Sequence, residues 1–411
     1  MSTTEDTVVV TGLGATTPLG GDVRTTWQGL LAGRSGARAL PDTWPQDLPV
    51  RFAATAVADP AEIVGRVTAR RMDRWQLFAL VAAREAWQDA GAPEVDPTRL
   101  GVVVCPGLGG ISSILASYET YQTQGWRRVS PYTIPSVMGN GAAGWISMEF
   151  GAQAGAHAPI SACASGAEAI GYAIDMIRSG RADVVLAGAG EAFILPVAIA
   201  SFAAMRAMSQ RNDDPEGASR PFDKGRDGFV IGEGGGVIVL ESAAHARRRG
   251  ARVYAVAAGA GYSADAHHIS APSGVGARAA MRFALDAARV KIDDVVHVNA
   301  HATSTPAGDV VEAAALAEVF GAGKVVVSAT KSMTGHLLGA TGAVESIATI
   351  LALAEKVAPP TINLDDPEDD LPIDVATEPR ELRSRTGAPL AAVNNSFGFG
   401  GHNVSLVFTA P

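Results

Sequence analysis

The chain has 411 residues, 47% hydrophobic and 18% charged, which is enough apolar material for a substantial core and excludes a disordered protein. Its formal net charge of −9 argues against nonspecific nucleic-acid binding, and its two cysteines are too few for a disulfide scaffold. No apolar run is long enough to span a bilayer and residues 1–6 carry no signal-type segment, so we expect a soluble cytoplasmic protein.

Short β-branched runs alternate along the chain with helical patterns, which is typical of an α/β protein. In chain order, we expect strands at 7–11, 100–105, 182–187, 236–240, 253–257, 295–299, 324–328 and 404–408. We expect helices at 24–32, 74–90, 164–178, 276–288, 309–320 and 340–354. Several strands are apolar on both faces, as expected for strands that helices cover on both sides.

The chain contains a faint internal repeat. A strand, a small-residue turn and a Gly/Ala-rich helix occur over 159–178 and again over 325–354, and strands run into loops of small residues at 100–110 and 295–305. This favours two similar halves, residues 1–250 and 251–411, although generic α/β patterning would give the same signal.

Two polar segments interrupt the pattern. Residues 209–228 form a long polar loop, and loops of this length inside compact domains are usually functional or mobile. The acidic stretch 365–370 is expected to be a solvated loop and nothing more.

Cys163 is the residue whose surroundings point most directly to chemistry. It lies between an apolar stretch and the helix predicted over 164–178, with small residues on both sides. The free amides and positive end of that helix would lower the pKa of the thiol below its ordinary value of about 8.5, so that the thiolate forms near neutral pH. A buried structural cysteine is the alternative that this residue alone leaves open.

Two histidines lie in segments rich in Gly, Thr and Ser. His301 stands in Asn-Ala-His-Ala-Thr-Ser-Thr after the strand 295–299, and His336 stands in Lys-Ser-Met-Thr-Gly-His-Leu before the helix 340–354. Neither has the spacing of a metal ligand set, so no metal is expected. The segment Asn-Ser-Phe-Gly-Phe-Gly-Gly over 395–401 could present backbone amides to an oxyanion, or be only a turn before the last strand.

These four segments, in this order and at these separations, resemble those of the β-ketoacyl-acyl carrier protein synthases of the condensing-enzyme family, and the resemblance covers essentially the whole chain. The elongating type II synthases of fatty-acid synthesis, particularly actinobacterial forms, are most similar. The resemblance implies an α/β, thiolase-like fold, in which two βαβαβαββ halves form a five-layered αβαβα core, usually as a dimer. It also implies decarboxylative Claisen condensation, in which malonyl-carrier protein extends an acyl group by two carbons and CO2 is released.

The family's catalytic residues carry over onto this chain position by position. Cys163 matches the nucleophile that holds the acyl group, and His301 and His336 match the paired histidines that stabilise the enolate. The backbone amides of Cys163 and Phe399 would form the oxyanion hole. Phe399 also matches a gate that moves when the cysteine is acylated.

Lys331 matches a family lysine that supports the site electrostatically. Its charge would bias His336 towards the neutral state. Glu312 and Glu345 are expected to be buried partners for this charge, because an unpaired ammonium group would be costly there.

Further positions carry over to the binding of substrate. Thr303 and Thr305 match residues that hydrogen-bond the phosphopantetheine arm of the carrier, so the substrates arrive on that arm and no separate cofactor is expected. Ile114 and Thr133 match residues that line the acyl tunnel, the second from across the dimer interface. Thr133 is smaller than the aromatic residue common at its position, so we expect a roomier tunnel.

Five arginines fall where the resemblance implies docking of an acidic acyl carrier protein: Arg70, Arg71, Arg127, Arg128 and Arg206. On a net-acidic chain, a local basic patch would steer an anionic partner to the mouth of the tunnel. Ordinary solubilising surface charge is the alternative.

Departures from the family pattern leave the pathway open. Ala302 and His402 replace a more usual Gly and Thr, and Gly-Ala-Gly-Glu over 188–191 replaces a more usual Gly-Gly-Thr-Glu. With Thr133, this leaves room for a ketosynthase subunit of a type II polyketide or polyene synthase, paired with a silent chain-length factor instead of a second copy. A non-catalytic acyl-binding or scaffold subunit is a more distant alternative. A thiolase is disfavoured, because the second cysteine, Cys105, lies early in a strand.

Overall fold

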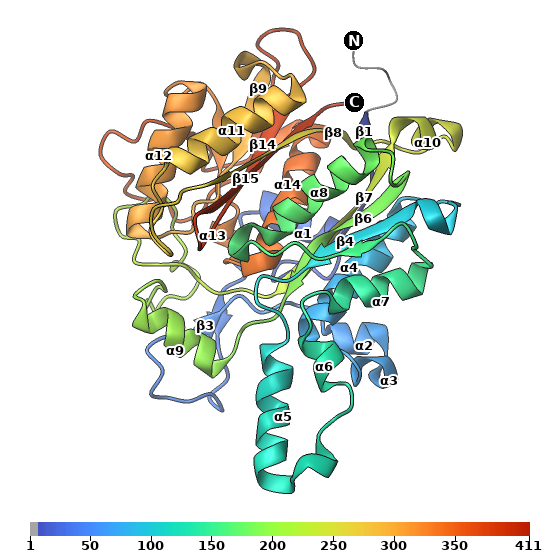
Figure 1. The fold of residues 1–411 in the computed structure, drawn as a ribbon. Helices are drawn as coiled ribbons and strands as arrows, with labels where there is room; N and C mark the ends of the chain where they lie inside the picture. The colour runs from blue at the N-terminus through green and yellow to red at the C-terminus, as the bar shows by residue number, and fades with distance from the viewer. Residues whose placement is uncertain (1–6) are drawn as a thin grey trace.

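The computed structural model of the chain describes residues 7–411, so the first six residues, where the sequence shows no signal-type segment, lie outside the described part. One sheet of eleven strands runs through the molecule in the order β12-β10-β9-β14-β15-β8-β1-β7-β6-β4-β5. Figure 1 shows helices on both sides of the sheet, with the blue to green N-terminal elements and the orange to red C-terminal elements gathered in different parts of the molecule.

The strands of the main sheet divide into two sets. The first set is β1 (Val8–Thr16), β4 (Leu100–Cys105), β5 (Ala156–His157), β6 (Val184–Glu191) and β7 (Gly234–Ser242). The second set is β8 (Ala255–Ala264), β9 (Val295–Asn299), β10 (Val326–Ser328), β14 (Ala391–Gly398) and β15 (His402–Thr409), with β12 (Asp374–Val375) at the edge. Two small sheets pair β2 (Arg38–Ala39) with β3 (Phe52–Ala53) and β11 (Val357–Ala358) with β13 (Arg380–Glu381).

The two sets repeat one topology. With the edge strand β12 left out of the count, the strands of each set lie in the order third, second, fourth, fifth, first, numbered as they appear along the chain. The fifth strand is antiparallel to both of its neighbours within the set, while the second, third and fourth strands are parallel. The first strands, β1 and β8, pair with each other and join the sets. The predicted architecture of two similar halves is therefore confirmed.

The helices form three layers around the two halves of the sheet. The longer ones are α1 (Val23–Leu31), α4 (Arg74–Asp89), α5 (Ile111–Gln124), α7 (Gly141–Phe150), α8 (Ser165–Arg178), α9 (Pro196–Ala204), α11 (Val275–Ala288), α12 (Pro306–Phe320) and α14 (Thr341–Glu355). The shorter ones are α2 (Pro60–Val64), α3 (Arg66–Ala69), α6 (Thr133–Val137), α10 (Ala243–Arg248) and α13 (Lys331–Thr334). The central layer is formed by α8 and α14, which contact each other and strands of both sets. On the outer face of the first set lie α4 and α7. On the outer face of the second set lies α11, with α12 packed beside it.

Two glycines allow the central helices to pack closely. A Cβ at Gly166 would lie 2.7 Å from the amide nitrogen of Ala343, and a Cβ at Gly342 would lie 2.7 Å from the amide nitrogen of Ala167. These reciprocal contacts are what an approximate twofold relation between the halves requires. The turns that precede the two helices, one of which carries Cys163, are therefore brought together in the middle of the molecule.

The central helix α14 is unusually apolar. Together with the turn before it, over Leu338–Glu355, it is the one helical stretch of residues 7–411 that is long and apolar enough to cross a membrane. However, 89% of this stretch is buried inside the protein. It is therefore a helix of the core.

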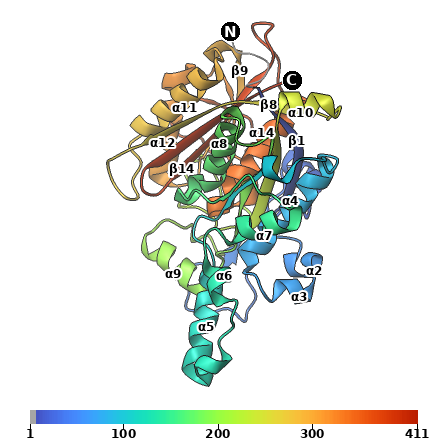
Figure 2. The same ribbon diagram turned by 45° about the vertical axis from the view of Figure 1, so that its right-hand side comes forward.

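A helical arm extends away from the body of the molecule. Figures 1 and 2 both show α5 pointing outward, with α6 near its base. Asp73, at the start of α4, holds the base of the arm: its carboxylate accepts hydrogen bonds from the hydroxyls of Ser112 at 2.7 Å and Ser113 at 2.6 Å. Large apolar side chains remain exposed along it: Ile114, Leu115, Tyr118, Tyr121, Trp126, Tyr132, Ile134 and Met138.

The acidic stretch 365–370 is more than a solvated loop, which corrects the expectation from sequence. The amides of Asp365 and Asp366 donate to the carboxylate of Asp223 at 2.9 and 2.7 Å, and Lys224 lies 2.7 Å from Asp369. The polar loop 209–228 is the segment that receives these contacts. The two segments therefore brace each other, because each satisfies the charges and amides of its partner.

Candidate active site

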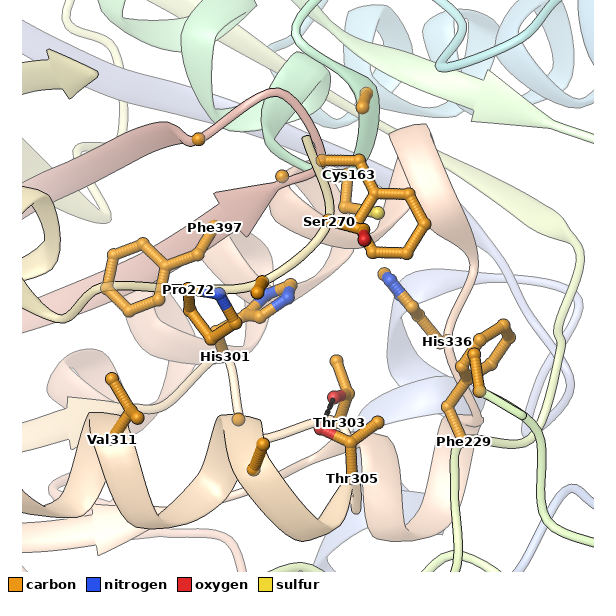
Figure 3. Close-up of a pocket in the computed structure, with 18 of the residues that line it drawn as sticks. Cys163, Phe229, Ser270, Pro272, His301, Thr303, Thr305, Val311, His336 and Phe397 are labelled. Atoms are coloured by element: carbon orange, nitrogen blue, oxygen red, sulfur yellow. Dashed lines mark hydrogen bonds between the residues drawn. The ribbon is translucent and has the colours of Figure 1, made fainter. Parts of the chain in front are cut away.

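A cavity of about 520 Å³ lies where the two halves meet. Figure 3 shows the sulfur of Cys163 and the rings of His301 and His336 turned toward the same space. The three residues come from the turn before α8, the loop after β9 and the turn before α14. The structure thus brings these three residues together, although the first and the last of them are 173 positions apart in the sequence.

Cys163 sits on a single turn of 3-10 helix, Ala162–Ala164, directly before α8. Ala162 adopts the left-handed region with φ of 53°, a strained conformation for a residue with a Cβ and one that occurs often at functional sites. Ser165 holds the turn, since its hydroxyl donates to Ala162 O at 2.7 Å and accepts from the amide of Ser161 at 2.9 Å. The turn therefore presents the thiol in one fixed position.

Two backbone amides face the sulfur, those of Cys163 itself and of Phe399, the pair expected to form an oxyanion hole. Phe399 follows β14, and Gly398 before it passes directly against the cysteine turn. A Cβ at Gly398 would lie 2.4 Å from Ser161 O and 3.1 Å from the amide nitrogen of Cys163. Only glycine allows this approach.

Burial raises the pKa of Cys163 to about 11, although the charge of Lys331 and the amide of Phe399 act in the opposite direction. The expectation of a thiol ionised near neutral pH is therefore wrong for this structure. Its side chain packs against an apolar cluster that includes Leu338, and the loss of water around the sulfur outweighs the effect of the helix end.

The two histidines lie edge to face, with ring centroids 5.5 Å apart and planes at 85°. The Nδ1 atom of His336 is hydrogen-bonded to the hydroxyl of Thr341 at 2.9 Å, which fixes the orientation of the ring. Burial, followed by the charge of Lys331, lowers the pKa of both rings well below the ordinary value of histidine. Both imidazoles are therefore neutral at physiological pH, as expected for His336.

Lys331 is almost completely buried and pairs with Glu345. Its Nζ atom donates to both carboxylate oxygens, at 2.9 and 2.8 Å, and Thr330 donates to the same carboxylate at 3.0 Å. Burial raises the pKa of Glu345 to about 7, whereas Lys331 acts to lower it. The pairing therefore holds the ammonium group of Lys331 in a fixed place, from which it lowers the pKa of both histidines.

Glu312 does not contact Lys331, which corrects one of the two expected pairings. Its carboxylate accepts hydrogen bonds from the amides of His301 at 2.8 Å and Ala302 at 2.7 Å, and from Asn395 at 3.3 Å. Glu312 therefore holds the loop that carries His301, and it feels the charge of Lys331 only at longer range.

Thr303 and Thr305 line the same cavity, and their hydroxyl oxygens lie 3.1 Å apart. The sequence reasoning missed the residues that hold this loop. Asp309 accepts from the amides of Ser304 at 3.1 Å and Thr305 at 3.3 Å. The run of Thr305, Pro306 and a buried carboxylate in the first helical turn is a helix-start pattern that could have identified Asp309.

The polar loop 209–228 also supports this segment. The amide of Arg220 donates to the hydroxyl of Ser304 at 2.9 Å, and the amide of Gly228 donates to Ser304 O at 3.0 Å. Arg226 is buried and donates to Thr305 O at 3.1 Å. The loop is therefore part of the scaffold of the cavity.

Aromatic rings, which the sequence reasoning also did not assign, back the histidines. Phe229 packs edge to face on His336 with ring centroids 5.5 Å apart, and Phe397 packs on His301 at 5.7 Å. Figure 3 shows both rings beside the imidazoles. They exclude water from the histidines and thus help to keep the rings neutral.

Ile114 and Thr133 do not line this cavity in a single chain. Both lie on the arm, Ile114 at 40% exposure on α5 and Thr133 at the start of α6. The hydroxyl of Thr133 is hydrogen-bonded to that of Ser117 at 2.7 Å. Their expected place in an acyl tunnel, Thr133 from across a dimer interface, therefore stays a prediction.

The five arginines are all exposed but lie in three separate places on the chain. Arg70 and Arg71 follow α3, with Arg71 over the ring of Tyr132, and Arg127 and Arg128 stand beyond the end of α5 on the arm. Arg206 alone lines the mouth of the cavity.

Two domains of one known family cover most of the chain. The β-ketoacyl synthase N-terminal domain matches residues 5–246, and the β-ketoacyl synthase C-terminal domain matches residues 254–365. The chain belongs to the β-ketoacyl synthase family. It is accordingly an acyltransferase of the ketosynthase type, as predicted.

Curated relatives support this membership. The 3-oxoacyl-[acyl-carrier-protein] synthase 2 of Mycobacterium tuberculosis (strain ATCC 25618 / H37Rv) is 46% identical over 408 residues, which are 98% of this chain and 96% of the relative. The synthase of the same name from Coxiella burnetii is 42% identical over 410 residues, 98% of both chains. The predicted resemblance to type II synthases, including actinobacterial ones, is thus confirmed.

Solved structures give the same fold. A type II polyketide ketosynthase, solved with its acyl-carrier protein and bound to a hexaketide, superposes with a TM-score of 0.90 at 30% identity, covering 98% of this chain and 99% of that one. The ishigamide ketosynthase/chain length factor superposes at 0.89 and 33% identity, with the same coverage. The β-ketoacyl synthase of Burkholderia phymatum STM815 superposes at 0.89 and 35% identity, again with the same coverage. The thiolase-like, five-layered fold is confirmed.

Proposed function

We propose that the chain extends acyl groups by two carbons through decarboxylative Claisen condensation with malonyl-acyl carrier protein. The observation that carries the proposal is one cavity that joins a thiol, two amides aimed at its sulfur and two neutral imidazoles. In this proposal the first half, residues 1–250, supplies the nucleophile, and the second half, 251–411, supplies both histidines and the lysine.

The first step is transfer of the acyl group to Cys163. The sulfur forms a bond to the thioester carbonyl, and the carbonyl oxygen becomes an oxyanion held by the amides of Cys163 and Phe399. The bond to the phosphopantetheine sulfur then breaks, and the proton of Cys163 ends on that leaving thiol. The raised pKa of Cys163 means that this proton leaves only as the new bond forms. Acyl transfer is therefore the step most sensitive to the cysteine's surroundings.

The second step is condensation. The malonyl group loses CO2, and the electron pair of the broken bond forms an enolate whose oxygen accepts hydrogen bonds from His301 and His336. Neutral imidazoles suit this role, because each can donate one N–H without bringing a charged acid that would protonate the carbanion. The carbanion attacks the acyl carbon, the bond to Cys163 breaks, and the released thiolate takes a proton from water.

Thr303 and Thr305 would hydrogen-bond the phosphopantetheine arm within this cavity. The negative charge that develops in the two steps is stabilised by the backbone amides of Cys163 and Phe399 and by the N–H groups of the two histidines. We therefore expect turnover to be unchanged by a metal chelator and to need no added cofactor.

An acyl carrier protein is the proposed partner. A similar ketosynthase has been solved with its acyl-carrier protein, and Arg206 stands at the cavity mouth of this net-acidic chain. We also propose that a second subunit covers the apolar arm, so that Ile114 of one subunit and Thr133 of the other line the acyl tunnel. The chain is 46% identical to a 3-oxoacyl-[acyl-carrier-protein] synthase 2 but only 30 to 33% identical to the two polyketide ketosynthases. This difference favours a role in fatty-acid synthesis as a homodimer over pairing with a chain-length factor.

Intact mass spectrometry tests the proposal. After incubation with acyl-carrier protein, the wild-type chain should gain the mass of one acyl group, and Cys163→Ala should gain none. Cys105→Ala is the matched control and should acylate normally, because that thiol is completely buried in β4. A wild-type chain that never carries an acyl group, or a Cys163→Ala variant that does, would refute the proposal and favour a scaffold.

A further inference from the structure

Glu191 is a buried carboxylate beside the cavity that the mechanism above does not use. It ends β6 and has no exposed surface. Its Oε2 atom accepts hydrogen bonds from the amides of Gly107 at 2.7 Å, Leu108 at 3.2 Å and Gly339 at 3.3 Å. Within residues 7–411, no basic side chain lies within 4 Å of it, and its Oε1 atom has no hydrogen-bond partner.

The approach of these groups is possible only because two residues are glycine. A Cβ at Gly107 would lie 2.7 Å from the Oε2 atom of Glu191 and 2.9 Å from the amide nitrogen of Gly339. A Cβ at Gly339 would lie only 2.0 Å from the amide nitrogen of Gly107. The carboxylate therefore fastens two turns that belong to different halves of the molecule.

Each of the two turns leads to a part of the active site. Leu108 lines the cavity, and α5 begins three residues later. On the other side, Leu338 lines the cavity with φ of 48°, and its turn leads into α14. The first residue of α14, Thr341, holds the ring of His336, and Glu345 one turn further pairs with Lys331.

We propose that Glu191 is a positioning residue for condensation, because its carboxylate clamps the Gly107–Leu108 turn to the Leu338–Ala340 turn and so sets the cavity wall beside Cys163 and the orientation of His336. The charge of the clamp also reaches the nucleophile. Burial is the main cause of the raised pKa of Cys163, and the carboxylate of Glu191 adds to it. Burial also raises the pKa of Glu191 to about 7, although its amide partners favour the charged form.

Two substitutions of Glu191 distinguish the effect of its hydrogen bonds to the two turns from the effect of its negative charge. Glu191→Gln keeps an oxygen acceptor for the three amides but removes the charge, whereas Glu191→Ala removes both. Glu241→Gln is the matched control, because Glu241 is equally buried on the neighbouring strand β7 but is bonded to Arg249, Thr11 and His245 away from the cavity. Circular dichroism on each full-length variant checks that it is folded.

The readouts are kcat and KM for condensation and the pH dependence of Cys163 alkylation by iodoacetamide. For Glu191→Ala we expect kcat to fall about tenfold or more with Cys163 still acylated, because a misplaced wall and imidazole impair the condensation geometry. For Glu191→Gln we expect kcat within about threefold of wild type, with alkylation shifted to lower pH because a negative charge is gone. Glu241→Gln should change neither readout.

Three results would overturn the proposal. They are a normal kcat in Glu191→Ala, equal losses of kcat in Glu191→Ala and Glu191→Gln, and an alkylation profile in Glu191→Gln that matches wild type. If Glu191→Ala does not fold, Glu191→Asp takes its place, because its shorter side chain keeps the charge but draws the carboxylate away from the three amides; a normal kcat in that variant would overturn the proposal. The proposal rests on the proposed function for its kcat readout only. A wild-type chain that carries no acyl group would refute that function, while the alkylation profile would still test Glu191.

Discussion

Replacement of Lys331 by methionine tests the electrostatic design of the site. The lysine side chain is 1% exposed, and its Nζ atom contacts both oxygens of Glu345. Methionine has a similar length but no charge, so Lys331→Met leaves a carboxylate buried without its cation. Removing one partner of a buried ion pair typically costs about 3–5 kcal/mol of stability.

The pH dependence of that loss follows from the pKa of Glu345, which burial already raises to about 7 with the lysine in place. Without Lys331 the pKa rises further above its unfolded value. A carboxyl group with a raised folded pKa favours the native state at low pH, and this contribution is lost as the pH rises through the folded pKa. We therefore expect Lys331→Met to lose clearly less stability at pH 6 than at pH 8.5.

Chemical denaturation at the two pH values measures these losses, and the double variant Lys331→Met/Glu345→Gln is the control. The double variant removes both charges, so its stability should return close to that of wild type at both pH values. Its turnover should not return. The positive charge that lowers the pKa of His336 and of Cys163 is absent from both variants. A Lys331→Met chain as stable as wild type at pH 8.5, or a double variant with normal turnover, would refute this reasoning.

Three further outcomes are expected. Alkylation of Cys163 by iodoacetamide should accelerate about tenfold per pH unit up to pH 9.5, because its pKa is about 11, and a plateau below pH 8 would contradict this. Replacing Arg127 and Arg128 by glutamate should raise the KM for acyl carrier protein in low salt, less so in high salt, and an unchanged KM would remove the docking role. Gly398→Ala should slow acylation about a hundredfold, because its Cβ would meet Ser161 O and displace an oxyanion donor, and normal acylation of the folded variant would disprove that arrangement.

The sequence was sufficient to predict the strands and helices whose pattern of apolar residues lies within the element itself. The strands β4 and β9 have the bounds predicted from their runs of valine, and the helices α4 and α8 end within a residue of the predicted ones. The strand β14 was missed because its middle reads Asn394-Asn395-Ser396, which is polar enough to indicate a loop. Two of these side chains find partners on α14 and β15: Asn394 donates to Gly342 O at 3.2 Å, and Asn395 accepts from the hydroxyl of Ser405 at 2.8 Å.

The site shows the same limit. The motifs identified Cys163, His301 and His336 as residues of one site, and the fold brings them into one cavity. The ionisation of Cys163 was misjudged because a helix end is visible in the sequence, whereas the burial that outweighs it comes from segments far along the chain. Spacing could not decide which glutamate meets Lys331, since only the folded chain places Glu345 against it and Glu312 against the loop of His301.

The most direct test of the central claim is a single-turnover chase on isolated acyl-enzyme. Wild-type chain carrying an acyl group on Cys163 is mixed with malonyl-acyl carrier protein, and intact mass spectrometry follows the adduct and the carrier together. We expect the adduct to disappear at the rate at which 3-oxoacyl carrier forms, and to persist in His301→Ala and His336→Ala. An adduct that persists in the wild type, or one that both histidine variants consume at the normal rate, would contradict the role of this cavity in condensation.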